Sequence, residues 1–136
     1  TPGDHGSTFG GNPLAAAVGL AALQTLENEG LAERAQREGA HLMTGLRALR
    51  HPAITDIRGK GLLVGVQIDP AFGSARAVCE ALMDEGVLTK DTHHTVVRLA
   101  PPLVIERAQV DEAVAALGRV LARLSQPTAA RVAVPA

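Results

Sequence analysis

Residues 14–26, LAAAVGLAALQTL, are the segment that most restricts how this chain folds. Asn12 is a favourable N-cap, Pro13 suits the first helical position and Gly30 suits a helix end, so the pattern predicts one helix. This helix is apolar almost all round until Gln24. A helix without a polar face is buried on several sides. A chain of 136 residues offers little to surround it, so part of its burial is expected to come from outside this sequence.

The remaining sequence alternates helical patterns with short strand patterns. Residues 31–49 carry apolar residues at three- and four-residue steps, which predicts an amphipathic surface helix. Residues 54–69, ITDIRGKGLLVGVQID, predict a strand, a glycine-containing turn or bulge and a second strand. A short helix is expected over 74–86, two strands around a polar loop over 87–99, and a last helix over about 106–124.

This order of elements predicts the α+β class, with a small sheet covered by helices. The first helix does not fit that unit, so a domain boundary is expected near Gly30. We therefore expect three regions: residues 1–30, a domain over 31–125, and a flexible tail over 126–136.

Composition narrows the function classes. Two Phe, no Tyr or Trp, and a net charge of -1 argue against a nucleic-acid-binding protein. No apolar run is long enough to span a bilayer, and the first residues lack a signal-peptide pattern. A single cysteine, Cys79, excludes an intramolecular disulfide and fits a reducing compartment. These features predict a soluble, cytoplasmic protein that binds neither nucleic acid nor membrane.

The first candidate ligand-binding stretch is HGSTFGGNPL, residues 5–14. The hydroxyls of Ser7 and Thr8 stand beside glycines, a combination that can cradle a phosphate. The stretch lacks the lysine of a P-loop and the spacing of the dinucleotide fingerprint. On the residues alone, the pattern favours a capped helix entry over a phosphate loop.

The second candidate is Arg98, in the stretch VVRLAPP. It shares a strand face with Val96, opposite Val97 and Leu99, and its planar fork suits a carboxylate. A solvent-facing position on an edge strand fits the pattern equally well. Nearby, the adjacent pair His93 and His94 is a candidate for metal binding. No further ligands have metal-like spacing, so a polar loop and no metal are predicted.

Three stretches together resemble a known family. HGSTFGGNPLA, IRGKGLLVGV and VVRLAPPLVI, in this order and at these separations, resemble the C-terminal third of class III aminotransferases. These are fold-type I enzymes that depend on pyridoxal phosphate. The resemblance covers Thr1 to about Leu124. It implies that residues 1–30 end a large cofactor-binding domain, and that residues 31–125 form a small C-terminal domain with a small antiparallel sheet.

The resemblance also implies roles for the candidate residues. Thr8, with Ser7 beside it, would contact the cofactor phosphate of the partner subunit in a homodimer. Arg98 would bind the α-carboxylate of the substrate. Neither Lys60 nor Lys90 matches the lysine that binds the cofactor covalently, so no catalytic residue is assigned and the chain alone is expected to be inactive.

The sequence of residues 86–105, GVLTKDTHHTVVRLAPPLVI, indicates which substrates to expect. This stretch is most similar to the branch of the family that transfers the terminal amino group of ornithine to 2-oxoglutarate. That reaction yields glutamate and glutamate semialdehyde, which cyclises to pyrroline-5-carboxylate. The branch acting on acetylornithine is the alternative, and a non-catalytic dimerisation or interaction module is another. A nucleotide-phosphate binder is disfavoured because the P-loop lysine is missing.

Overall fold

A computed structural model of the chain describes residues 6–8 and 10–124. Its elements are α1 (Pro13–Asn28), α2 (Leu31–Ala48), β1 (Ile54–Lys60), β2 (Leu63–Ile68), a short 3-10 helix (Pro70–Phe72), α3 (Ala75–Asp84), β3 (Lys90–Thr92), β4 (Val96–Leu99) and α4 (Arg107–Arg123). The predicted order of helices and strands and the α+β class are confirmed. The predicted tail over 126–136 lies outside the described residues. Within the described part, no helix combines the length and apolarity needed to cross a membrane.

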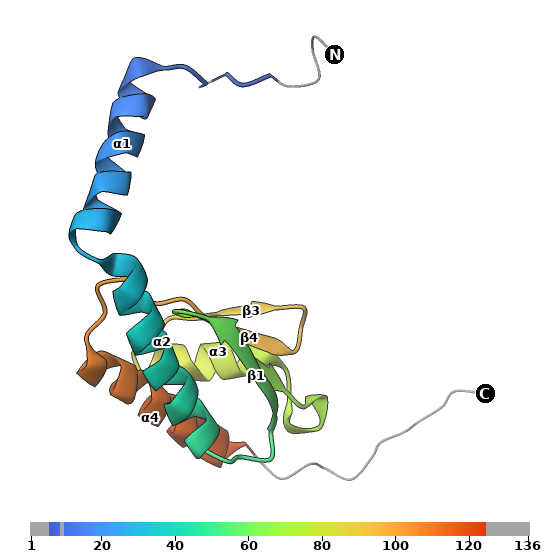
Figure 1. Cartoon of the computed structure of the whole chain (residues 1–136). Coiled ribbons are helices and arrows are strands. Elements are labelled where there is room, and N and C mark those ends of the chain that lie inside the picture. Colours follow the sequence, from blue (N-terminus) through green and yellow to red (C-terminus); the bar gives the residue numbers. More distant parts are fainter. Residues whose placement is uncertain (1–5, 9, 125–136) are drawn as a thin grey trace.

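The four strands form one antiparallel sheet in the order β1-β2-β4-β3. Successive side chains of a strand point to opposite faces, so each strand contributes to a covered and an open face. The covered face is buried and apolar; its central residues are Val64, Val66, Ile68, Val97 and Leu99. Helices α2 and α3 pack on this face, and α4 packs against both helices (Figure 1).

The β1–β2 hairpin turns at Gly61 and Leu62. Gly61 has a φ of 54°, in the left-handed region that favours glycine, so the predicted glycine turn is confirmed. The bulge lies elsewhere, between Ile54 and Asp56. Helix α2 crosses this turn at Gly39, where an added Cβ would lie 2.1 Å from the carbonyl oxygen of Gly61. A second glycine is therefore needed for α2 to pack on the hairpin.

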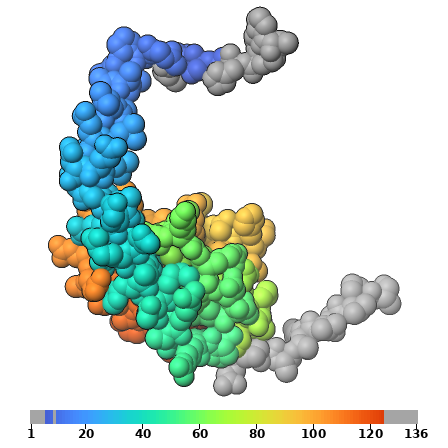
Figure 2. Space-filling model, viewed as in Figure 1, coloured from blue at the N-terminus to red at the C-terminus, as the bar shows by residue number. Residues whose placement is uncertain are grey.

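Helix α1 begins as its sequence predicts. The Asn12 side-chain oxygen accepts hydrogen bonds from the backbone N–H groups of Leu14, at 2.9 Å, and Ala15, at 3.2 Å. No residue of α1 is buried, and Leu14 is 74% exposed. Figures 1 and 2 show α1 projecting from the rest of the molecule. It joins α2 through Gly30, which has a left-handed backbone with a φ of 58°.

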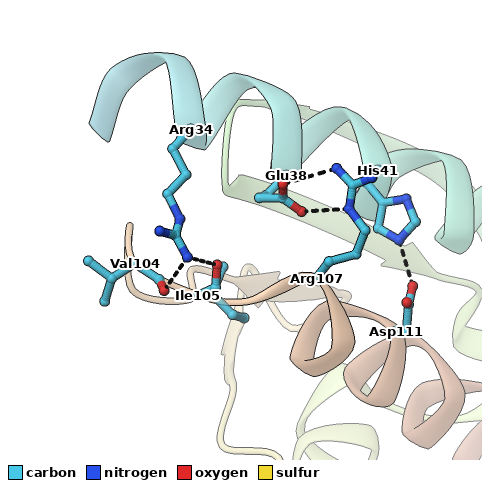
Figure 3. Close-up of polar contacts among 7 residues, drawn as sticks. All are labelled: Arg34, Glu38, His41, Val104, Ile105, Arg107 and Asp111. Atoms are coloured by element: carbon cyan, nitrogen blue, oxygen red, sulfur yellow. Dashed lines mark hydrogen bonds and ion pairs between the residues drawn. The ribbon is translucent and has the colours of Figure 1, made fainter. Parts of the chain in front are cut away.

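Ion pairs link the facing sides of α2 and α4. Arg107 donates two hydrogen bonds to the Glu38 carboxylate, at 3.0 and 3.2 Å (Figure 3). His41 Nε2 lies 2.6 Å from an Asp111 carboxylate oxygen. These partners are about seventy residues apart in sequence, so no local pattern reveals them.

Candidate functional site

Arg98 lies on an inner strand of the sheet. Strand β4 lies between β2 and β3, so the alternative of a solvent-facing residue on an edge strand is wrong about the edge but right about the exposure of Arg98. Val97 and Leu99 point into the core, and alternation places Arg98 on the open face together with Val96, as predicted. Arg98 is exposed. Its side chain makes no hydrogen bond or ion pair with another residue of the described part of the chain, which leaves the guanidinium available for a ligand.

Hydrogen bonds anchor the residue before β4 and the loop that follows it. Before β4, the carbonyl oxygen of Thr95 accepts a 2.7 Å hydrogen bond from the backbone N–H of Ile68. After β4, Arg34 of α2 donates to the carbonyl oxygens of Val104 and Ile105, each at 2.8 Å (Figure 3). Sequence reasoning missed Arg34, because a charged residue on a helix surface carries no signal for carbonyl groups seventy residues away. These contacts anchor the segments on either side of the strand that carries Arg98.

Arg98 lies on the open face of the sheet and not in the nearby hollow. A hollow of about 620 Å³ lies at the end of the sheet, lined in part by Lys60, Leu63 and Pro101, and Arg98 does not line it. Elsewhere on the open face, Arg58 donates a 2.7 Å hydrogen bond to the Asp56 carboxylate.

The Ser7–Thr8 loop is exposed and has one internal side-chain hydrogen bond among the described residues. Ser7 Oγ accepts a 2.9 Å hydrogen bond from the backbone N–H of Gly10, which closes a small turn. Both hydroxyl residues are exposed, and Thr8 has no hydrogen bond to another described residue. An added Cβ at Gly6 or Gly11 would meet nothing within 4 Å, so the backbone there is open to a ligand. The free Thr8 hydroxyl and the bare backbone fit a phosphate.

One copy of the chain does not bring the two candidates together. The Ser7–Thr8 loop lies beyond the free end of α1, whereas Arg98 lies on the sheet (Figure 1). The 16 residues of α1 span about 24 Å. Any ligand that touches both groups would have to reach them on different copies or in a larger assembly.

His93 and His94 lie in the loop between β3 and β4. Both have positive φ, 50° and 62°, and the carbonyl oxygen of His94 accepts a hydrogen bond from the N–H of Ala75 at the start of α3. In residues 6–8 and 10–124, no three or more His, Cys, Asp or Glu side chains gather as a metal site would require. Cys79 is buried in α3, and this burial raises the pKa of its thiol.

Comparison with known proteins places these features in one family. The family model for class III aminotransferases matches residues 1–121. The ornithine aminotransferase of Bordetella pertussis is 52% identical over 121 residues, covering 89% of this chain and 29% of that protein.

Solved structures agree in sequence and shape. The ornithine aminotransferase of Toxoplasma gondii, whose structure has partial occupancy of PLP at the active site, matches with a TM-score of 0.82 and 41% identity. That match covers 91% of this chain and 30% of the other. The acetylornithine aminotransferase of Elizabethkingia anophelis matches with a TM-score of 0.79 and 43% identity, covering 90% and 33%.

This chain thus spans about a third or less of the length of these three relatives. The match nevertheless includes the Ser7–Thr8 loop, α1 and the whole sheet with Arg98. The resemblance noted from three short stretches is confirmed over most of the chain, which belongs to the class III aminotransferase family.

Proposed function

We propose that this chain forms the C-terminal part of a pyridoxal phosphate-dependent aminotransferase that acts on ornithine and 2-oxoglutarate. The observation that carries the proposal is Arg98, an exposed guanidinium without a partner among the described residues, on an inner strand paired on both sides. The ornithine aminotransferases among its relatives support the choice of substrates.

Arg98 binds the carboxylate of the oxo acid. Its planar fork donates two parallel hydrogen bonds, which fixes the direction in which the carboxylate points. Because β4 is paired with β2 on one side and β3 on the other, the backbone that carries Arg98 is fixed before the substrate arrives. The keto carbon is then held toward the reacting centre, and the bimolecular step gains from this positioning.

Thr8 and Ser7 bind the cofactor phosphate. When bound, pyridoxal phosphate supplies the electron sink that lets an amino group move between carbon skeletons. The Thr8 hydroxyl donates to a phosphate oxygen, and Ser7 keeps the loop in its turn through Gly10. The loop lies far from Arg98 of the same copy (Figure 1), which supports a homodimer in which it serves the partner's site. No residue of this chain is assigned the covalent cofactor bond, so the chain alone is inactive.

An acetylornithine aminotransferase is the second candidate, because the Elizabethkingia anophelis enzyme is 43% identical over the matched region. Both candidates use the same Arg98 and the same phosphate loop. They differ in the amino donor, ornithine in one case and N-acetylornithine in the other.

The donor assay tests the proposal in a full-length aminotransferase that contains this chain. With 2-oxoglutarate as acceptor, we expect kcat/KM for ornithine to exceed that for N-acetylornithine by about tenfold or more. The opposite ratio would select the second candidate. Absence of glutamate with either donor would contradict an aminotransferase of this branch.

A further inference from the structure

Arg98 belongs to a row of residues that crosses the open face of the sheet. The strand register aligns Arg58 with Gly65, and Gly65 with Arg98. It also aligns Arg98 with Lys90, on the neighbouring edge strand β3. Side-chain alternation puts all of these residues on the face opposite the core.

The cation at the far end of the row already has partners. Arg58 donates to the Asp56 carboxylate at 2.7 Å and to the Gln67 side-chain oxygen at 3.4 and 3.5 Å. Gly65 then separates Arg58 from Arg98 without contributing a side chain. Its missing Cβ would lie 3.2 Å from a methyl group of Val96, so this position stays bare. The charge of Arg58 is matched by Asp56, so Arg58 is not available to bind a ligand together with Arg98.

Arg98 and Lys90 form an unmatched pair of cations. Both are exposed, and neither makes an ion pair with another residue of the described ranges. The adjacent acid, Asp91, points to the other face, where its carboxylate lies 3.8 Å from Arg76. Directly opposite residues on one face have Cβ atoms about 4.5–5.5 Å apart, and like charges there destabilise the sheet. An anion bound between the two side chains would remove this repulsion.

We propose that Lys90 is a second cation of the substrate carboxylate site, with its ammonium group donating to the same carboxylate that Arg98 binds. The inference rests on the proposed role of Arg98. An ionised carboxylate accepts about four hydrogen bonds, and a bidentate arginine uses two of them. The flexible lysine takes one of those that remain. The expected ligand class is a 2-oxo acid, with 2-oxoglutarate as the acceptor of the proposed reaction.

A different role for Lys90 makes a different prediction. Lysines on edge strands discourage pairing with other chains, because a charged edge is a poor template for another strand. That role requires Lys90 for solubility alone. It predicts no change in the binding of a carboxylate when the charge is removed.

The test compares four variants of a full-length aminotransferase that contains this chain. Lys90→Gln removes the charge, and Lys90→Arg keeps it. Lys60→Gln is the matched control, since Lys60 is an exposed lysine on the same face of β1 that lies outside the row. Arg98→Gln reports on the proposed site itself. The readouts are KM and kcat for 2-oxoglutarate, and the affinity for glutarate, an unreactive five-carbon dicarboxylate, by titration calorimetry.

We expect Lys90→Gln to raise KM for 2-oxoglutarate and the Kd of glutarate about five- to tenfold, with kcat within about twofold. Lys90→Arg and Lys60→Gln should each stay within about twofold of the unmodified enzyme, and Arg98→Gln should weaken binding further than Lys90→Gln. If Lys90→Gln matches Lys60→Gln while Arg98→Gln weakens binding, the inference about Lys90 is overturned and the role of Arg98 stands. If Arg98→Gln also leaves binding unchanged, the proposed function of Arg98 fails with it.

Discussion

Helices α1 and α2 are consecutive and similar in length, with 16 and 18 residues, yet they obtain opposite environments. The more apolar helix, α1, buries no residue. The amphipathic helix α2 buries Leu31, Gly39, Leu42 and Leu46. The apolar content of a helix therefore does not by itself determine whether the helix is buried. An apolar stripe is buried when a complementary surface faces it, and α2 has the sheet and α4 on its inner side.

The exposed side chains of α1 form a surface that soluble monomers avoid. Val18 and Leu23 are each 61% exposed, and Leu20 is 58% exposed. Contiguous apolar surface of this kind marks an interaction site. Because this chain spans 29% of the length of its Bordetella pertussis relative, we propose that the rest of a longer polypeptide covers α1. Residues 31–124, in contrast, surround a core of their own.

The largest difference between the two helices is expected from a pair of matched truncations. Leu46 is 1% exposed and Leu23 is 61% exposed, so the same Leu→Ala change samples the core in one case and the open surface in the other. We expect Leu46→Ala to lower the free energy of unfolding by about 2–5 kcal/mol, through lost burial and the cavity left behind. Leu23→Ala should change it by less than about 0.5 kcal/mol.

Urea denaturation followed by circular dichroism measures both leucine variants. The experiment uses this chain by itself, in which α1 is uncovered, and equal losses for Leu46→Ala and Leu23→Ala would show that α1 shares the core of residues 31–124. The comparison between the two helices would then be wrong.

Two glycine substitutions, one in each helix, are expected to have a smaller effect on stability. At Gly39 of α2, an added Cβ would lie 2.1 Å from the backbone oxygen of Gly61, whereas at Gly19 of α1 it would meet nothing within 4 Å. Gly39→Ala should therefore destabilise by about 1–3 kcal/mol, because the helix must move off the hairpin. Gly19→Ala should increase helix content, since alanine favours a helix over glycine by about 1 kcal/mol. Thermal unfolding and helical ellipticity report both effects, and a neutral Gly39→Ala would refute the close packing.

The smallest expected effect concerns charge and depends on pH. Arg119 and Arg123 hydrogen-bond the Glu85 carboxylate and hold its pKa below the ordinary value. A carboxyl with a lower pKa in the folded state stabilises the fold above its unfolded pKa, and this contribution disappears as pH falls through the folded pKa. Glu85→Gln should thus lower the urea midpoint at neutral pH and have no effect in strong acid. Glu27→Gln, on exposed α1, is the control, and a Glu85→Gln effect that persists in acid would exclude this ion pair as its cause.

Local sequence patterns predicted the elements and the side-chain directions within them. Alternation in VVRL placed Arg98 on the face opposite Val97 and Leu99, and the cap at Asn12 appears as predicted. The place of β4 in the strand order could not be predicted from the local pattern. The edge-strand part of the alternative for Arg98 failed because the pairing of β4 with β2 joins segments about thirty residues apart, which alternation does not encode.

Polar contacts between residues far apart in the sequence were also not predicted. Arg34, which holds the loop after β4, and the His41–Asp111 pair depend on how α2 lies against the rest of the fold. The roles of Ser7 and Thr8 were outside the reach of local chemistry, because a hydroxyl beside glycine also suits a helix entry. Their assignment rests on the family resemblance and stays a proposal.

We propose that the two regions of the chain serve different parts of one reaction, with Thr8 on the side of α1 and Arg98 on the sheet. The most direct measurement is the single-turnover rate at which 2-oxoglutarate is converted to glutamate by a full-length aminotransferase containing this chain, with cofactor retention after dialysis measured in parallel. We predict that Arg98→Ala slows this rate by about a hundredfold or more with the cofactor retained, since a charge-assisted bidentate contact is lost. Thr8→Ala should instead release the cofactor. An unchanged rate in Arg98→Ala would contradict the account.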